Sequence, residues 1–192
     1  MKHKALQSLL LAIAFVVTLG VATACSDKDD ISKTWDEYEV WRKANDEFFN
    51  TKRLSILPNG QPEYESLIPE WNGTAQVLIR YLNDRSKTIG NLSPLYNSTV
   101  DVKYIGRLYN GTAFDSSYLQ TQYGDSIFRT AVNSVVPGWT IALQNMRCGD
   151  SVEVVIPYTL GYGSQVTGAI YPYSTLVFNI KLVDIPYYEV RP

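Results

Sequence analysis

Few side chains in this sequence of 192 residues are of the types that build nucleophilic or metal-binding sites. The one histidine is His3, and the only cysteines are Cys25 and Cys148. A Ser-His-Asp or Cys-His site needs a histidine, and a zinc site needs several nitrogen or sulfur ligands. The phosphate-binding patterns G-x-x-x-x-G-K-[ST] and G-x-G-x-x-G are absent as well. We therefore expect a function that uses no cofactor, no metal and no covalent intermediate.

The N-terminus has the pattern of a secretory signal peptide. Basic residues at positions 2–4 precede an apolar run from Leu9 to Val21, and small residues at 22–24 precede Cys25. The apolar run is too short for a membrane span, which takes about 20 residues. A cysteine at this place resembles the bacterial lipobox, in which it becomes the lipidated first residue of the mature protein. An ordinary secretory signal with an incidental cysteine is the alternative.

We accordingly predict a signal peptide over 1–24 and a lipoprotein anchored to the membrane through Cys25. Its expected location is the bacterial cell envelope, either periplasmic or at the cell surface. The mature chain would keep 168 residues, with 15 Lys and Arg against 19 Asp and Glu. This acidic balance argues against nucleic acid as a partner. With Cys25 acylated, Cys148 has no partner for an intramolecular disulfide.

Hydropathy patterns divide the mature chain into an extension and a domain. Residues 34–50 predict an amphipathic helix, because aromatic residues recur at steps of three and four. The stripe consists of Trp35, Tyr38, Trp41, Ala44 and Phe48. It packs either on the chain's own domain or, as a sharper alternative, on a partner or a second copy. Residues 51–73 carry several prolines, asparagines and glycines and predict a connection.

From residue 75 onward the pattern is one of short strands with a single short helix. Alternating apolar residues predict strands over 76–82, 99–108, 151–156 and 175–185. Between them, apolar residues at 139, 142, 143 and 146 share one helical face. We therefore predict an α+β fold, with a tether and helical extension over 25–74 and the folded domain over 75–192.

Five blocks of sequence follow one another in this domain. They are Val102 to Leu108, Gly111 to Ser117, Val135 to Gly149, Ile156 to Gly163 and Ile170 to Phe178. In this order and spacing they resemble the blocks of the FKBP-type peptidyl-prolyl cis–trans isomerases, which begin with V-x-Y-x-G-x-L, G-x-x-F-D-S-S and V-I-x-G-W. The resemblance covers residues 75–186. It implies a strongly bent antiparallel sheet of about five strands wrapped around one short helix.

The resemblance also implies a site, in an apolar cleft between the helix and the concave face of the sheet. The matching residues are Tyr104, Phe114, Asp115, Val135, Val136, Trp139, Tyr162, Ile170 and Phe178. In this assignment Trp139 forms the floor under a proline ring. The Val136 backbone N–H and the Tyr162 hydroxyl donate to substrate carbonyls, and Asp115 orients the site without acting as a base.

The activity implied is rotation of X–Pro bonds in envelope or secreted proteins, a rotamase that assists protein folding as a chaperone. Its partners would be polypeptides that contain proline. A non-catalytic FKBP-like module that binds peptides is the alternative, and a purely structural surface lipoprotein is a third hypothesis. Asp115, Trp139 and Tyr162 together favour the enzyme. Ala169 and the region of Ser126 depart from the family pattern and favour the binding module.

Overall fold

The computed structural model describes residues 34–187. The predicted signal peptide and Cys25 lie outside the described residues. Within residues 34–187, no helix has both the length and the apolar character that a membrane crossing requires.

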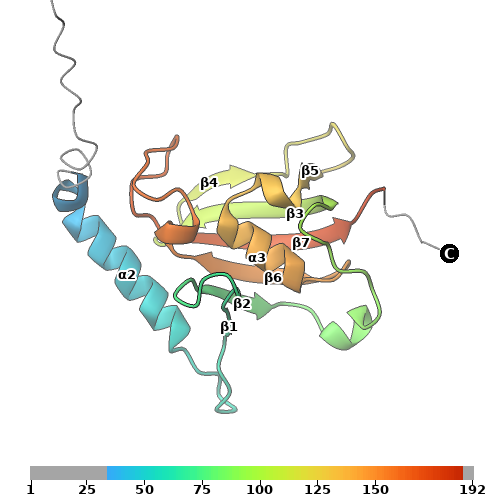
Figure 1. Cartoon of the computed structure of the whole chain (residues 1–192), viewed down its shortest axis with the longest axis horizontal. Coiled ribbons are helices and arrows are strands. Elements are labelled where there is room, and N and C mark those ends of the chain that lie inside the picture. The colour runs from blue at the N-terminus through green and yellow to red at the C-terminus, as the bar shows by residue number, and fades with distance from the viewer. Residues whose placement is uncertain (1–33, 188–192) are drawn as a thin grey trace, which may run out of the picture.

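An antiparallel sheet of seven strands forms the centre of the described chain (Figure 1). The strands are β1 (Glu65–Leu67), β2 (Val77–Tyr81), β3 (Thr99–Leu108), β4 (Ala113–Ser116), β5 (Phe128–Ala131), β6 (Ser151–Ile156) and β7 (Leu176–Asp184). Their order is β1-β2-β6-β7-β3-β4, and β5 also pairs with β3. The N-terminal half of β3 pairs with β5 and its C-terminal half with β4, so β4 and β5 share one edge of the sheet.

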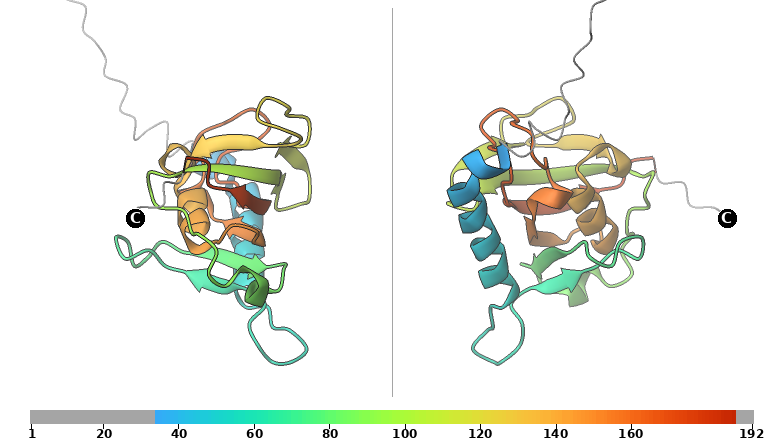
Figure 2. Two further views of the ribbon diagram at one scale, coloured as in Figure 1. Left: turned by 90° about the vertical axis from the view of Figure 1, so that its right-hand side faces the viewer. Right: turned by 60° about the vertical axis from the view of Figure 1, so that its left-hand side comes forward.

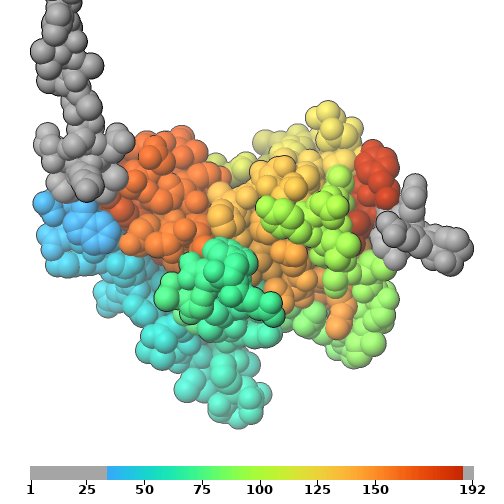
Figure 3. All heavy atoms as spheres, in the orientation of Figure 1, coloured from blue at the N-terminus to red at the C-terminus, as the bar shows by residue number. Residues whose placement is uncertain are grey.

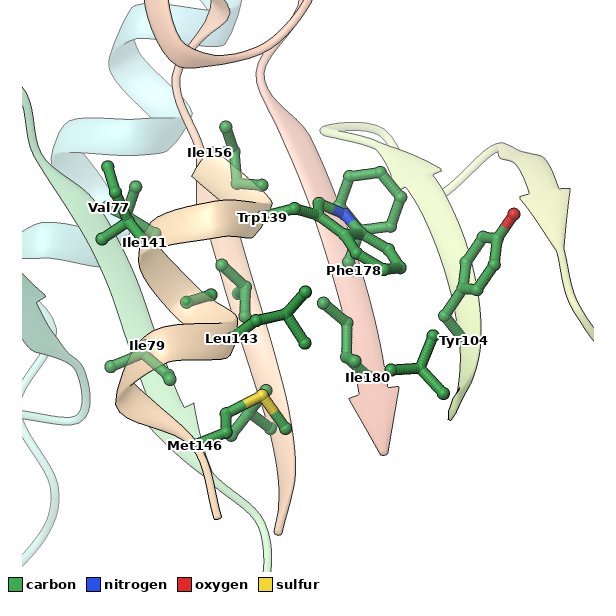
Figure 4. Packing of buried hydrophobic residues seen from close by; sticks show 14 of the residues in the cluster. Val77, Ile79, Tyr104, Trp139, Ile141, Leu143, Met146, Ile156, Phe178 and Ile180 are labelled. Carbon is green, nitrogen blue, oxygen red and sulfur yellow. The ribbon is translucent and has the colours of Figure 1, made fainter. Parts of the chain in front are cut away.

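The short helix α3 (Pro137–Asn145) packs on one face of this sheet and closes the main core (Figure 4). Trp139 and Leu143 of α3, and Met146 directly after it, point toward the strands, where they meet apolar residues such as Ile156 on β6 and Ile180 on β7. Gly138 allows this close packing, because a Cβ at that position would collide with the Ile156 side chain. The predicted α+β fold is confirmed.

The opposite face of the sheet is covered by the helix α2 (Glu39–Arg53) (Figure 2). Neighbouring residues of β6 point to opposite faces, so Val154 joins the core under α3 while Val155 joins a second cluster. Phe48 and Phe49 of α2 pack against that second cluster. The aromatic stripe of the helix therefore packs on the chain's own domain, which was the first of the two alternatives.

The structure differs from the sequence prediction in several bounds. Residues 34–37 are helical, Tyr38 is in a turn, and α2 then continues to Arg53, three residues beyond the predicted end. The sheet has two more strands than the five expected. One of them is β1, which lies in the segment predicted as a connection and pairs with β2. The sheet thus begins ten residues before the predicted start of the domain at 75. Single turns of 3-10 helix lie in the connections: η1 (Arg85–Thr88), η2 (Val132–Ser134) and η3 (Tyr158–Leu160).

Candidate active site

A cavity of about 270 Å³ opens between α3, β3, β7 and the strands at the sheet edge. It is lined by Tyr104, Phe114, Asp115, Phe128, Ser134, Val135, Val136, Trp139, Tyr162 and Phe178. Eight of these ten residues belong to the nine that the sequence assigned to a cleft. Segments distant in sequence therefore converge on one hollow, in the place between helix and sheet where the resemblance put it.

Aromatic rings meeting edge to face form the wall of the cavity. The Trp139 ring lies between those of Tyr104 and Phe178, with centroids 5.1 Å from each and interplanar angles of 88° to both. The Phe178 ring in turn meets that of Phe114 at 5.5 Å and 90°, and the Tyr104 ring meets that of Phe128 at 5.5 Å. Edge-to-face contacts are a favoured geometry for aromatic pairs. The rings therefore hold one another in place and leave an apolar hollow.

Gly106 makes room for this wall. It lies on β3, and a Cβ there would come within 2.7 Å of both the Phe114 and the Phe178 rings. Real Cβ atoms do not approach other heavy atoms so closely, so any side chain at this position would displace the two rings. A backbone without a side chain in the C-terminal half of β3 is what lets the aromatic residues of β4 and β7 turn into the cavity.

One carboxylate lies at the edge of the aromatic wall. The Tyr104 hydroxyl donates to Asp115 Oδ2 at 2.5 Å, and the Ser116 backbone N–H donates to Asp115 Oδ1 at 2.7 Å. Burial, followed by this hydrogen bond to Asp115, raises the pKa of Tyr104 well above its usual value. Tyr104 is therefore protonated throughout the neutral range and can keep donating to Asp115. The pair fixes the orientation of the carboxylate.

Two donors face the cavity without a partner in residues 34–187. Neither the Val136 backbone N–H nor the Tyr162 hydroxyl makes a hydrogen bond within this part of the chain. Val136 precedes the first turn of α3, where backbone N–H groups lack helical partners. Burial, and to a smaller degree the charge of Asp115, raises the pKa of Tyr162, so its hydroxyl also keeps its proton at neutral pH. Both groups are free to bind carbonyl oxygens.

The observed lining of the cavity differs from the sequence assignment at three positions. Ile170 is buried in the core with 4 % of its surface exposed and does not line the cavity. Phe128 and Ser134 line it but were not among the assigned residues. Phe128 stands in β5 opposite Val102 of β3, and this pairing, which brings it to the cavity, is not recorded in the local sequence. Ser134 carries no sequence signal either, since it lies in the single turn η2 before α3.

The described residues hold no group of three or more His, Cys, Asp or Glu side chains arranged to bind a metal ion. The arrangement is that of an α+β domain with an aromatic cavity of about 270 Å³, flanked by a carboxylate and by two donors that are unpaired within residues 34–187. Such a cavity suits an apolar group flanked by peptide carbonyls.

Comparisons with known proteins define the family. Residues 91–183 match the FKBP-type peptidyl-prolyl cis-trans isomerase family. A crystal structure of a peptidyl-prolyl cis-trans isomerase from Pseudomonas syringae aligns with a TM-score of 0.60 and 30% identity, over 77% of this chain and 95% of that chain. The crystal structure of FkpA from Escherichia coli aligns with a TM-score of 0.58 and 26% identity, over 82% of this chain and 63% of that one. The chain belongs to the FKBP-type peptidyl-prolyl cis–trans isomerase family.

Curated relatives agree over the same region. The chain is 44% identical over 99 residues to the macrophage infectivity potentiator of Trypanosoma cruzi, covering 50% of this chain and 47% of the relative. It is 40% identical over 94 residues to the FKBP-type isomerase FkpA of Escherichia coli, covering 48% of this chain and 33% of the relative. The chain therefore spans about half or less of the curated relatives it matches.

Proposed function

We propose that this chain is a peptidyl-prolyl cis–trans isomerase that binds polypeptides at proline and accelerates rotation of the X–Pro bond. The observation that carries the proposal is the aromatic cavity floored by Trp139, which is 4 % exposed, within a chain of the isomerase family. The residues assigned to catalysis and binding are part of the proposal: Tyr104, Phe114, Asp115, Val135, Val136, Trp139, Tyr162 and Phe178.

The chemistry suits a site without a nucleophile. Rotation of a peptide bond faces a barrier of about 18–20 kcal/mol that comes from amide resonance. A site lowers this barrier when it binds the twisted amide better than the planar one. The twisted amide has lost resonance, so its oxygen carries less negative charge and enters an apolar cavity at a smaller desolvation penalty.

In the proposed binding mode the proline ring lies on the Trp139 indole between the Tyr104, Phe114 and Phe178 rings. The Val136 N–H and the Tyr162 hydroxyl donate to carbonyl oxygens of the residues that flank the bond. Asp115 holds Tyr104 in place and contributes its field. No proton is transferred at any step.

Location and biological role belong to the same proposal. A relative in Legionella longbeachae, 42% identical over 93 residues, is named an outer membrane protein. Together with the signal-peptide pattern before Cys25, this supports a lipid-anchored protein of the bacterial cell envelope. There it would assist the folding of envelope or secreted proteins. Association with a partner or a second copy through helix 34–50 stays a prediction, and it would have to use the face of α2 that does not contact the sheet.

One experiment separates the enzyme from a non-catalytic binding module. The mature chain is mixed with a single proline-containing peptide, binding is measured by calorimetry, and cis–trans exchange is measured by NMR. We expect binding together with exchange far faster than the uncatalysed tens to hundreds of seconds. Binding with exchange at the uncatalysed rate would leave the family and the fold intact and would contradict the enzymatic proposal.

A further inference from the structure

A second hollow lies beside the aromatic cavity, along the outer side of α3. Its volume is about 660 Å³, and it is lined by Trp71, Tyr96, Asn133, Val135, Pro137, Thr140, Ile141 and Gln144. Val135 lines both hollows. The two hollows therefore adjoin at Val135, and an extended chain that leaves the aromatic cavity past Val135 comes to the second hollow.

The walls of this hollow are large apolar side chains left in water. Trp71 is 67 % exposed and Tyr96 is 60 % exposed, and the nearby Ile68 and Leu95 are exposed as well. Figure 3 shows the green segment around residue 71 and the light green segment around residue 96 on either side of the orange α3. Contiguous exposed apolar surface of this kind marks binding sites on soluble proteins.

Both walls are held in place before anything binds. In the first segment the Ala75 backbone N–H donates to the Asn72 carbonyl at 3.1 Å, and the Thr74 hydroxyl donates to Asn72 Oδ1 at 2.7 Å. These bonds fix the turn that carries Trp71.

The second wall is tied to the domain in the same way. The Cys148 N–H donates to the Leu92 carbonyl at 2.8 Å, and the Val132 N–H donates to the Ser98 carbonyl at 2.9 Å. The segment that carries Tyr96 thus lies between two fixed points. A preformed site loses little conformational entropy on binding.

The chemistry of the lining indicates the ligand. Asp115 is the only charged residue that lines either hollow, and neither has a basic one. Gln144 is exposed, and within residues 34–187 its amide makes no hydrogen bond, so it can pair with a peptide backbone. An uncharged, partly aromatic surface with a free amide fits an extended polypeptide that carries an apolar side chain.

We propose that Trp71 and Tyr96 form a second subsite, which binds an apolar side chain of the substrate polypeptide a few residues away from the X–Pro bond. The proposal rests on the proposed function, because it takes the occupant of the aromatic cavity to be proline. Trp71 lies outside the family match over 91–183. Tyr96 lies inside that match, so the subsite combines one residue of this chain's own extension with one residue of the matched family region.

The test compares a short peptide with long ones. The short peptide has four residues around one X–Pro bond. The long peptides keep these residues and add a segment containing one phenylalanine, at a different offset before or after proline in each peptide. For the mature chain we expect at least one long peptide to have a kcat/KM roughly tenfold above that of the short one, the gain expected from burying one apolar side chain. Trp71→Ser and Tyr96→Ser should abolish this advantage, and Trp71→Phe should keep most of it.

One control variant and several contrary outcomes complete the test of the subsite. Leu54→Ser changes an exposed apolar residue after α2 that lines neither hollow. The ratio of its kcat/KM on the long peptide to its kcat/KM on the short peptide should therefore equal that of the parent chain. An unchanged ratio in Trp71→Ser and Tyr96→Ser would overturn the subsite. If the ratio is unchanged and the same variants also shift from dimer to monomer in sedimentation, the surface belongs to a second copy, and the subsite is likewise overturned. A failure of the proposed function differs from both, because then neither peptide is accelerated.

Discussion

At the scale of single residues, Trp139 forms the floor of the proposed site. Its ring contacts Tyr104 and Phe178 edge to face. Trp139→Ala would leave a large cavity and cost about 3–5 kcal/mol of stability, so Trp139→Leu is the cleaner change. We expect Trp139→Leu to lower kcat/KM on a proline peptide by about tenfold or more, which corresponds to at least about 1.4 kcal/mol of transition-state binding.

The matched control for this variant is Phe48→Leu. Phe48 packs in the cluster on the other face of the sheet and does not line the cavity. It should reduce the melting temperature without a comparable loss of turnover. Equal losses of turnover in both variants, measured well below their melting temperatures, would show that the Trp139 effect is one of stability alone.

Tyr104 and Tyr162 set the expected dependence on pH. The pKa of each is raised by burial, and for Tyr104 next by its hydrogen bond to Asp115. A raised tyrosine pKa keeps the neutral hydroxyl to higher pH, so both donors persist below about pH 10. We expect kcat/KM to be flat from about pH 6 to 9, without the bell of an acid–base pair.

The raised pKa values of Tyr104 and Tyr162 also make the stability of the fold depend on pH. The stabilisation from these tyrosines is fully present below the unfolded pKa, about 10, and is lost as pH rises through the raised folded value. Unfolding in urea should therefore show constant stability between neutral pH and about pH 9, and a decline only in more alkaline buffer. For the isomerase reaction itself, a bell-shaped dependence of kcat/KM on pH, centred near neutrality, would contradict the proposal that no proton is transferred.

At the scale of elements, α2 is joined to the loop that carries Tyr162 by a buried asparagine. Asn45 Oδ1 accepts from the Thr175 backbone N–H at 2.7 Å, and Asn45 Nδ2 donates to the Trp41 carbonyl at 2.8 Å. Trp41 Nε1 in turn donates to the Ser174 hydroxyl at 3.1 Å. The residues before β7 are thus fastened to the helix rather than to the sheet alone.

We expect Asn45→Ala to reduce stability by about 1–3 kcal/mol, because the buried Thr175 N–H loses its acceptor. Turnover should fall as well, since the connection from β6 to β7 contains Tyr162. Asn50→Ala is the control on the same helix. Asn50 is exposed, and its side chain accepts only from Arg53, at 3.3 Å, so stability should change by less than about 0.5 kcal/mol. Thermal unfolding and kcat at one temperature measure both effects, and identical values for the two variants would contradict the coupling.

Sequence patterns predicted the elements that have a buried face and missed those that do not. β3 and β7 alternate over most of their length and β6 ends in a buried apolar run, and each was predicted within a residue or two of its bounds. β1 buries only Leu67, and β4 has four residues with none fully buried. Such short edge strands are defined by pairing with β2 and β3, which no local pattern records.

The residues of the candidate site also fall into those that the sequence located and those that it did not. Tyr104, Trp139 and Phe178 lie on well-patterned elements that the fold brings together, so the family blocks located them. Ile170 lies in the long connection between β6 and β7, where the direction of a side chain depends on the loop path. Its burial in the core rather than in the cavity was not readable from the sequence.

At the scale of the whole molecule, extension and domain form one packed unit over residues 34–187. The sheet is covered by α3 on one face and by α2 on the other, so its two apolar clusters are both closed within one chain. The proposed anchor therefore precedes a compact body whose cavity, between α3 and the sheet, is not lined by residues 34–74, the described part of the extension.

This arrangement allows the anchor to be tested apart from the site. We expect the mature chain to sediment with membranes and Cys25→Ser to remain in the supernatant, because acyl chains bind bilayers through their buried methylene groups. Cys148→Ser is the matched control, since it removes the other cysteine, a half-buried free thiol of the folded domain whose pKa is raised by burial. It should sediment like the parent chain. Isomerase activity should be equal in Cys25→Ser and the parent. If Cys25→Ser still sediments with membranes, the lipoprotein prediction is wrong and membrane association must come from another part of the chain.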